Sequence, residues 1–329
     1  MRPEFDPKEY FRTPRVFLAP MAGYTDRVFR ALCFEQGCEG ACSEMVSAKG
    51  LCFGSEKTQE LLSAYESEYP RGIQLFGSDP AYMEKAVRLL GDPEAGRFDY
   101  IDINCGCPAR KIVTNGDGSA LMRDIPLAAR VAEAVVKVSP VPVSVKFRLG
   151  PDSEHICAVP FARAMMESGV SFLCVHGRTT EQQYSGCADW ERIAEVKSAV
   201  SVPVLGNGDI TGGQTAVEKL SVSGCDGLVV GRAALGNPFI FREIRCALDD
   251  RAYTPPTVEE RAGMALQHAD AVVAEKGAHA LIELRKHLPL YFNGLRGAAQ
   301  LRTALSCIKT PEELRAVLLD IKARGIYNK

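Results

Sequence analysis

A cysteine in a predicted tight turn is the residue of this sequence best suited to proton transfer. Cys107 lies in Asn104-Cys105-Gly106-Cys107-Pro108, where glycine and proline favour a turn directly after a β-branched run. The ordinary thiol pKa of about 8.5 keeps such a group mostly protonated near neutral pH, so it suits a general acid. Because Cys105 is close by, two other roles stay open for this motif: a redox pair of the two cysteines, or a nucleophile. A disulfide closed over one residue would be strained, and we expect Cys105 to pack inward.

Two further polar residues, Gln74 and Lys146, lie near the ends of apolar runs, where they would project toward a common mouth. A buried lysine needs a partner. The pyrimidine edge of a reduced flavin would provide one, because it carries negative charge and can accept hydrogen bonds. An aspartate across the same mouth would provide another, and these residues alone leave both interpretations open.

Two glycine-containing turns suit a phosphate group. Gly206-Asn207-Gly208-Asp209 and Gly231-Arg232 each follow an apolar run. Glycine lets the backbone approach an anion, and the arginine adds positive charge. A tight turn between a strand and a helix also needs glycine, so a purely structural role stays open as well.

Short β-branched runs alternate with amphipathic stretches up to about residue 245, and they would position these side chains. Eight such runs predict an α/β fold, a (β/α)8 TIM barrel, whose site lies at the carboxyl ends of the strands. The predicted strands are Val16–Ala19, Gly40–Ser43, Gly72–Phe76, Tyr100–Asn104, Val143–Phe147, Phe172–Val175, Val202–Gly206 and Gly227–Val230. The predicted helices are Arg27–Gln36, Tyr82–Leu90, Pro126–Val138, Phe161–Ser168, Trp190–Ala199 and Gly213–Ser221.

A small all-helical domain is predicted to follow the barrel. The strand pattern ends by residue 248, and a polar segment with two prolines over residues 249–256 predicts a linker. Residues 1–248 are then the barrel domain and residues 257–329 the helical domain. Apolar residues at helical spacing predict the helices Val258–Glu275, Ala280–Tyr291 and Glu312–Arg324.

Positive charge is concentrated in the C-terminal segment. The whole chain has a net charge of −2, yet residues 257–329 hold 11 Lys and Arg against 8 Asp and Glu. From Leu284 to Pro311 there is no acidic residue. The segment is therefore +3 and the rest of the chain −5, so the positive charge is gathered at one end.

Composition is that of an ordinary globular protein of 329 residues, 46% of them hydrophobic. No stretch approaches the roughly 20 apolar residues of a membrane span, and the charged N-terminus does not resemble a signal peptide. We therefore expect a cytoplasmic protein. Its 12 cysteines are spread along the chain, and the early ones lack the C-x2-C spacing that structural zinc sites favour. We expect buried thiols and no metal at Cys33, Cys38, Cys42 and Cys52.

Motifs spread over nearly the whole chain match one family in order and spacing. They are Ala19-Pro20-Met21-Ala22-Gly23-Tyr24-Thr25-Asp26, Gln74-Leu75-Phe76-Gly77, Asp102-Ile103-Asn104-Cys105-Gly106-Cys107-Pro108, Val145-Lys146-Phe147-Arg148, His176-Gly177-Arg178-Thr179, Tyr184-Ser185-Gly186, Asn207-Gly208-Asp209-Ile210, Gly231-Arg232-Ala233-Ala234, and Arg285-Lys286-His287 with Tyr291 and Gly294. With these motifs the chain resembles the bacterial tRNA-dihydrouridine synthases, most closely their B-type branch. Tyr24 departs from the smaller β-branched residue usual there and Asp117 from an alanine, and we expect both departures to affect substrate fit more than chemistry.

The resemblance implies an FMN-containing barrel, NADPH as the reductant and a helical RNA-binding domain. It implies reduction of uridine in tRNA to 5,6-dihydrouridine, with hydride transfer from flavin N5 to uracil C6 and with Cys107 protonating C5. It also implies that Asn104 borders both flavin and uracil. The residues that it implies for FMN are Pro20, Met21 and Ala22 along the ring, Gln74 and Lys146 at the pyrimidine edge, His176 close to the ring, and Asn207, Asp209, Gly231 and Arg232 at the ribityl chain and phosphate.

Basic residues near the mouth and on the helical domain are the expected RNA contacts. Two other functions stay open: a flavin barrel enzyme acting on ribosomal RNA or on a small pyrimidine, as dihydroorotate dehydrogenases do, and an RNA-binding protein without catalysis. The basic helical domain argues against a small substrate, and Cys107 with Lys146 and His176 argues against lost catalysis. No motif indicates a protein partner. The expected RNA contacts are Arg110, Lys111, Arg178, Arg285, Lys286, Arg296 and Arg302.

Overall fold

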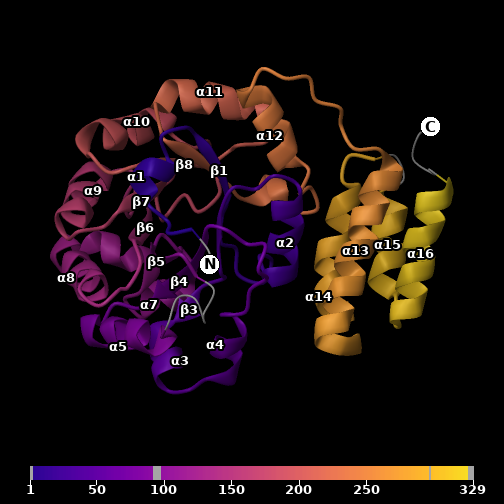
Figure 1. Ribbon diagram of the computed structural model, residues 1–329, viewed down its shortest axis with the longest axis horizontal. Coiled ribbons are helices and arrows are strands. Elements are labelled where there is room, and N and C mark those ends of the chain that lie inside the picture. Colours follow the sequence, from indigo (N-terminus) through magenta and orange to yellow (C-terminus); the bar gives the residue numbers. More distant parts are fainter. Residues whose placement is uncertain (1–2, 92–97, 296–297, 325–329) are drawn as a thin grey trace.

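The computed structural model describes residues 3–91, 98–295 and 298–324. Figure 1 shows two units side by side, a barrel of strands ringed by helices and a bundle formed by the last helices of the chain. Within these described ranges, no helix is both long and apolar enough to cross a bilayer.

The strands form one parallel sheet that closes on itself. β9 pairs with β1, β1 with β2, and β2 with β4, so the sheet is an eight-stranded barrel as predicted. The predicted strand Gly40–Ser43 occurs as the two-residue strand β2, and a second short strand that was not predicted, β3, follows it after Met45; both pair with β4. The strands are β1 (Arg15–Leu18), β2 (Ala41–Cys42), β3 (Val46–Ser47), β4 (Arg71–Phe76), β5 (Tyr100–Cys105), β6 (Val143–Arg148), β7 (Phe172–His176), β8 (Val204–Asn207) and β9 (Gly227–Val230).

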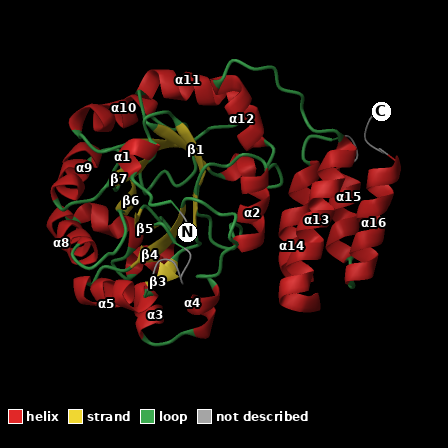
Figure 2. Ribbon diagram, viewed as in Figure 1, coloured by secondary structure: helices red, strands yellow, loops and turns green. Residues whose placement is uncertain are grey.

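Helices cover the outside of the barrel (Figure 2). Several begin at an aspartate whose carboxylate accepts backbone N–H groups of the first turn, as Asp79, Asp124 and Asp189 do. The predicted helices all occur, with ends shifted by at most a few residues. The helices of this unit are α1 (Pro7–Tyr10), α2 (Arg27–Glu35), α3 (Ala48–Cys52), α4 (Glu56–Glu60), α5 (Pro80–Leu90), α7 (Arg110–Thr114), α8 (Ile125–Val136), α9 (Ala158–Glu167), α10 (Trp190–Ala199), α11 (Gly213–Ser223) and α12 (Ile240–Leu248), with 3-10 turns at Gly118–Arg123 and Arg232–Ala234.

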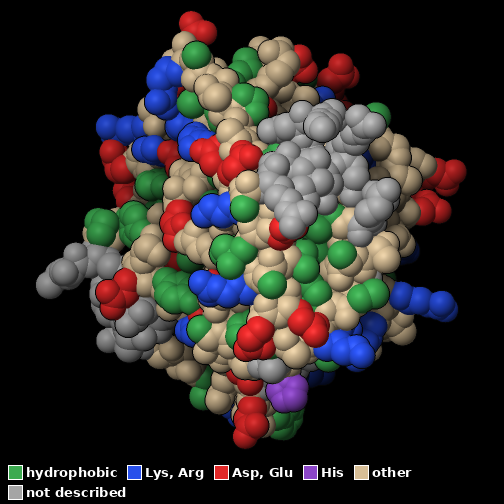
Figure 3. All heavy atoms as spheres, turned by 90° about the vertical axis from the view of Figure 1, so that its right-hand side faces the viewer, with side chains coloured by type: hydrophobic (Ala, Val, Ile, Leu, Met, Phe, Trp, Pro, Cys, Tyr) green, Lys and Arg blue, Asp and Glu red, His purple; other side chains and the backbone are tan. Residues whose placement is uncertain are grey.

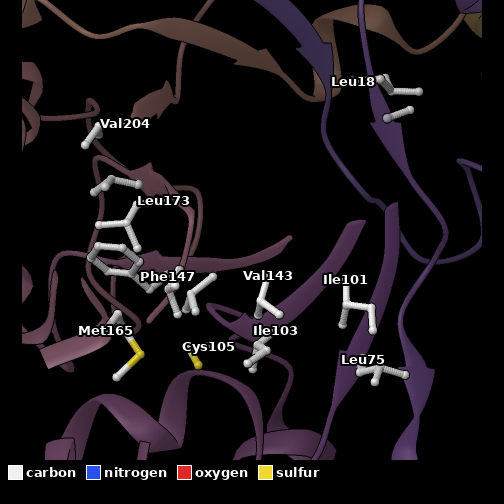
Figure 4. Packing of buried hydrophobic residues seen from close by; sticks show 14 of the residues in the cluster. Leu18, Leu75, Ile101, Ile103, Cys105, Val143, Phe147, Met165, Leu173 and Val204 are labelled. Atoms are coloured by element: carbon white, nitrogen blue, oxygen red, sulfur yellow. The ribbon is translucent and has the colours of Figure 1, made fainter. Parts of the chain in front are cut away.

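Alternation along the strands separates the core from the site. Ile101, Ile103 and Cys105 of β5 are at most 1% exposed and pack between the strands and the surrounding helices (Figure 4). Successive side chains of a strand point to opposite faces, so Asp102 and Asn104 point into the barrel instead. The apolar run thus forms the core, and the polar residues within it are free to build a site.

An aromatic cluster closes the amino-terminal end of the barrel. Tyr100 and Phe172 begin β5 and β7, and Phe5 packs on both, with ring centroids at 5.6 and 6.0 Å. Phe11 packs on Phe172 at 5.4 Å. All four rings are buried. A cavity inside the barrel therefore forms toward the carboxyl ends of the strands.

The C-terminal helices share a second apolar core. This core includes Leu284, Tyr291 and Leu318, and it also takes in Val28 and Leu32 of α2, so the bundle docks against the barrel. The expected linker at residues 249–256 lies between α12 and the first helix of the bundle. The bundle comprises α13 (Val258–Lys276), α14 (Ala280–His287), α15 (Ala298–Cys307) and α16 (Pro311–Arg324), with 3-10 turns at Gly277–His279 and Leu288–Phe292.

Two predictions for this segment were wrong. The helix predicted over Ala280–Tyr291 is α-helical only to His287 and continues as a 3-10 turn, in which Pro289 has no N–H to donate. Helix α15 was not predicted at all, because its short apolar pattern lies inside the acid-free basic stretch. These differences leave the all-helical character of the segment unchanged.

Candidate active site

A cavity of about 880 Å³ lies at the carboxyl ends of the strands. This volume is in the range of small-molecule and cofactor sites. The cavity brings together most of the residues predicted from the sequence, namely Pro20, Met21, Ala22, Gln74, Asn104, Cys107, Arg110, Lys146, His176, Arg178, Asn207, Asp209, Gly231 and Arg232. It does not include Lys111, Arg285, Lys286 or Arg302, and Arg296 lies outside the described residues.

Hydrogen bonds at both backbone groups fix Cys107 in the wall of this cavity. Its N–H donates to Asn104 Oδ1 at 2.9 Å. Its carbonyl oxygen accepts from the backbone N–H of Ser119 at 3.1 Å and from Ser119 Oγ at 2.8 Å. Cys105 is 1% exposed and packs into the core, as expected. Cys107 is thus the thiol of this turn that faces the cavity.

The surroundings of Cys107 keep its thiol protonated. Burial raises the pKa of the thiol above its ordinary value. The backbone N–H of Ala109 and the positive charges of Arg148 and Lys146 act in the opposite direction, but their effect is smaller. A protonated thiol beside two cations can release a proton to a substrate and leave a stabilised thiolate.

A buried hydrogen-bond chain orders the inner face of the cavity. Gln74 Nε2 donates to Asp102 Oδ2 at 2.7 Å, and Gln74 Oε1 accepts from Asn104 Nδ2 at 2.8 Å. Ser144 Oγ donates to the other oxygen of Asp102 at 2.6 Å. The chain fixes the amide orientation of Gln74, which retains one N–H for a ligand. Because Asn104 also accepts the N–H of Cys107, it anchors the cysteine turn to this hydrogen-bond network.

Lys146 extends from β6 toward β8. Its Nζ donates to Asn207 Oδ1 at 3.1 Å, and Asn207 Nδ2 in turn donates to the carbonyl oxygen of Val229 at 2.6 Å. In the part of the chain that the structure describes, Lys146 makes no ion pair with an aspartate or glutamate. The charge of Lys146 nevertheless opposes the rise that burial causes in the pKa of Asp102, so both interpretations of this lysine stay predictions. The ammonium group has donors left for a bound ligand.

His176 is an uncharged member of the site. It ends β7 and is paired in register with Arg148 of β6 and Asn207 of β8. Burial lowers its pKa to about 2, and the positive charges of Lys146, Arg148 and other cations of the site act in the same direction. Its imidazole is therefore neutral at working pH and can exchange hydrogen bonds without adding charge.

Arg178 and Asp209 bind each other. Arg178 Nη2 lies 2.7 Å from Asp209 Oδ2, and the same carboxylate accepts the backbone N–H of Ala188 at 2.7 Å. Arg178 is 2% exposed and also donates to the carbonyl oxygens of Ser185 and Gly186. The guanidinium is therefore inside the protein, where it lines the cavity, and the expected contact of Arg178 with RNA stays a prediction. Its Nη1 is buried and has no hydrogen-bond partner among the described residues.

Two residues of the cavity were missed from the sequence. Arg148 donates to the carbonyl oxygens of Gly106, Thr179 and Gln183 at 2.8 to 2.9 Å, which ties the cysteine turn to the next loop. Tyr184 is 54% exposed, and the guanidinium groups of Arg148 and Arg232 lie 5.7 and 4.6 Å from its ring centroid. Strand alternation was the available signal, because Arg148 follows Lys146 by two residues and so points to the same face.

The basic residues of the helical bundle are dispersed. Figure 3 shows Lys and Arg side chains interspersed with Asp and Glu on the face that the bundle presents, so the positive excess forms no continuous patch there. Arg285 donates to the carbonyl oxygen of Ile308 at 2.6 Å, which gives it a structural contact. Lys286 lies over Tyr24 of the barrel, with Nζ 5.1 Å from the ring centroid, and Arg302 is exposed.

A family model described as dihydrouridine synthase matches residues 17–324. The match covers the barrel strands, the cavity and the helical bundle. The chain belongs to the dihydrouridine synthase family.

Curated proteins of this family match the chain over most of their length. The tRNA-dihydrouridine synthase B of Xanthomonas campestris pv. campestris is 38% identical over 313 residues, which cover 94% of this chain and 93% of that protein. The protein of the same name from Pseudomonas aeruginosa is 39% identical over 290 residues, covering 88% and 86%. An old yellow enzyme homologue from Zymomonas mobilis has a TM-score of 0.50 at 16% identity, over 75% of this chain and 92% of that one, and so shares the barrel fold.

Proposed function

We propose that this chain is a tRNA-dihydrouridine synthase that holds FMN in the barrel cavity and uses NADPH to reduce specific uridines of tRNA to 5,6-dihydrouridine. The position of Cys107 is the observation that carries the proposal. Its thiol is protonated and half-buried, and hydrogen bonds fix both of its backbone groups in the wall of a cofactor-sized cavity. Membership of the family and the names of the relatives support the substrate class.

The residues of the cavity fit FMN. The unpartnered Nη1 of Arg178 is a buried cationic donor that a phosphate would satisfy. Arg232 and the turns at Gly231 and Asn207 would hold the phosphate and the ribityl chain, and Asp209 would act by orienting Arg178. Lys146, Gln74 and His176 would hold the isoalloxazine ring, with the main chain of Pro20, Met21 and Ala22 along it.

The bound flavin, once reduced by NADPH, would supply the hydride for C6 of the uracil. In this proposal Cys107 donates its proton to C5 of the uracil. The charges of Arg148 and Lys146 then stabilise the thiolate that remains. Asn104 holds the cysteine turn and would border both flavin and uracil. The contribution expected from such a positioned acid is roughly 100- to 10,000-fold in rate.

The target uridine has to leave the stacked RNA to reach this thiol. Unstacking costs a few kcal/mol by analogy with enzymes that flip bases. Tyr184, whose side chain is exposed in the cavity wall, would give a flipped nucleotide an aromatic contact. Phosphate contacts from Arg110, Lys111, Lys286 and Arg302 would offset the rest of the cost.

The proposal divides the chain by role. Residues 1–248 form the catalytic domain, residues 249–256 the linker and residues 257–329 the RNA-binding domain. A cytoplasmic location follows from the tRNA substrate. The packing of α2 into the core of the bundle supports a fixed arrangement, in which one RNA contacts both domains at once.

The first test is the visible spectrum of the purified protein, followed by addition of NADPH and unmodified tRNA. Flavin absorption that bleaches with NADPH, together with dihydrouridine in the tRNA, is the expected result. Bound flavin with no reduction of tRNA would redirect the proposal to ribosomal RNA or a small pyrimidine. A protein that neither holds nor takes up flavin would overturn it.

A further inference from the structure

A turn at the end of β1 forms one wall of the cavity. Met21, Ala22 and Tyr24 of this turn line the cavity directly. The carbonyl oxygen of Met21 accepts the backbone N–H groups of Tyr24 and Thr25 at 2.9 and 3.0 Å. Thr25 Oγ1 accepts the N–H of Met21 at 2.8 Å. The shape of the cavity on this side depends on whether residues 21–25 keep this conformation.

Gly23, at the tip of this turn, is held from both domains. Its N–H donates to the carboxylate of Glu44, which follows β2 in the barrel. Its carbonyl oxygen lies 3.2 Å from Nε2 of His287, the last residue of α14 in the bundle. Gly23 has a φ of +76°, and an added Cβ would lie 2.9 Å from Lys286 Nζ. The positive φ is what favours glycine here, because the end of the flexible Lys286 side chain could move away from a Cβ.

His287 is well placed to act on this turn. It is 6% exposed, and its ring lies 5.0 Å from Tyr24, 6.4 Å from Phe29 and 5.3 Å from His268, between centroids. Since a carbonyl oxygen only accepts, the proton of the contact with Gly23 is on Nε2. A histidine confined on three sides by rings has little freedom to turn this N–H elsewhere.

We propose that His287 is a positioning residue, through which the helical domain fixes the turn at residues 21–25 and with it one wall of the cofactor cavity. The inference rests on the proposed function only in taking flavin as the occupant of the cavity. The bundle is then a part of the cofactor site as well as a candidate RNA-binding domain. A change at His287 would alter the cavity without any residue of the cavity being changed.

Other contacts also hold the two domains together, so the hydrogen bond between His287 and Gly23 can be removed without undocking them. Arg27 Nε pairs with Glu275 at 2.8 Å, and Lys276 Nζ pairs with Asp26 at 3.1 Å. Val28 and Leu32 add apolar contact with the bundle. Loss of the imidazole should therefore leave the domains docked and free only the turn.

The test compares His287→Ala with His287→Gln, whose amide N–H reaches nearly as far as Nε2. His279→Ala, at an exposed histidine of the same domain, is the matched control. In the full-length protein, His287→Ala should speed amide hydrogen exchange of Tyr24 and Thr25 roughly 3- to 10-fold, the effect of losing one hydrogen bond. It should raise the dissociation constant of FMN by a similar factor. His287→Gln and His279→Ala should stay close to the wild-type protein.

Two outcomes would overturn the inference. Exchange of residues 21–25 that is unchanged in His287→Ala would show that the turn holds its conformation without the histidine. Equal losses in the Ala and Gln variants, with the same fall in Tm, would show that the ring acts by packing alone. The exchange measurement uses the flavin-free protein, so it stands even if the cavity binds another cofactor and the proposed function fails.

Discussion

The side-chain oxygen of Asn104 lies 2.9 Å from the backbone nitrogen of Cys107 and accepts its hydrogen bond. The amide nitrogen of Asn104 donates to Gln74 Oε1 at 2.8 Å. A single side chain thus links the turn that carries the thiol to the ordered inner face of the barrel. The distance between the proton donor and the cofactor position is set by this link, and it can be tested directly.

Replacing Asn104 by Ala should slow uridine reduction roughly 10- to 100-fold. The change leaves the N–H of Cys107 without its acceptor, which costs about 1–3 kcal/mol and lets the cysteine turn move. Asn104→Asp keeps an acceptor for the N–H of Cys107 and should lose less. The measurement is the single-turnover rate of the pre-reduced enzyme with excess tRNA. A rate in the Ala variant equal to that of the wild type would exclude the anchoring role.

Replacing Cys107 by Ala should leave the flavin spectrum intact and slow uridine reduction roughly 100- to 10,000-fold, the loss expected for a general acid. Reduction by NADPH should persist, since the thiol takes no part in it. Cys187→Ala, at an exposed thiol, is the control and should behave as the wild type. Turnover undiminished in Cys107→Ala would rule the thiol out as the acid.

The single-turnover rate should stay constant through neutral pH and decline only on the alkaline side. Burial raises the pKa of Cys107, so the thiol keeps its proton to a higher pH than a free cysteine does, above about 8.5. The acid is active below this pKa and is lost as the pH rises through it. His176, whose pKa is lowered to about 2, adds no step near neutrality. A decline centred below the ordinary thiol value would contradict the assignment.

Arg302→Ala should weaken tRNA binding and reduce the slope of log affinity against log salt by about 1, the effect of losing one phosphate contact. Arg315→Ala is the matched control, because this exposed arginine of the same domain pairs with Asp270 at 2.7 Å. Arg285 is less suitable for the test, since its bond to Ile308 makes it part of the fold. NADPH oxidation should survive in both variants. If the slope of log affinity against log salt is unchanged in Arg302→Ala, Arg302 makes no phosphate contact and is only a solvated surface charge.

The barrel could be predicted from the sequence because each strand is a local apolar run that ends at a turn residue. The short strand β3 was not predicted, and it follows Glu44, whose carboxylate accepts the N–H of Gly23, a residue distant in sequence. Helix α15 was missed because charge dominates its surroundings and its apolar face is short. Its stability comes from the shared core of the bundle.

The site shows the same division between local and distant information. Cys107 could be predicted because glycine and proline beside it shape a local turn. The burial of Arg178 could not be predicted, because its partner Asp209 lies on another loop and holds the guanidinium inward. Arg148 was overlooked because its three carbonyl partners come from two other loops.

The aromatic cluster of Phe5, Phe11, Tyr100 and Phe172 has a kinetic consequence. Within the part of the chain that the structure describes, these rings close one end of the barrel, so both reactants of the proposed reaction arrive through the opposite end. In the proposed reaction, the oxidised nicotinamide would then have to depart before a nucleotide could take its place. Initial rates at several fixed concentrations of one reactant should therefore give parallel double-reciprocal lines, as in a double-displacement scheme.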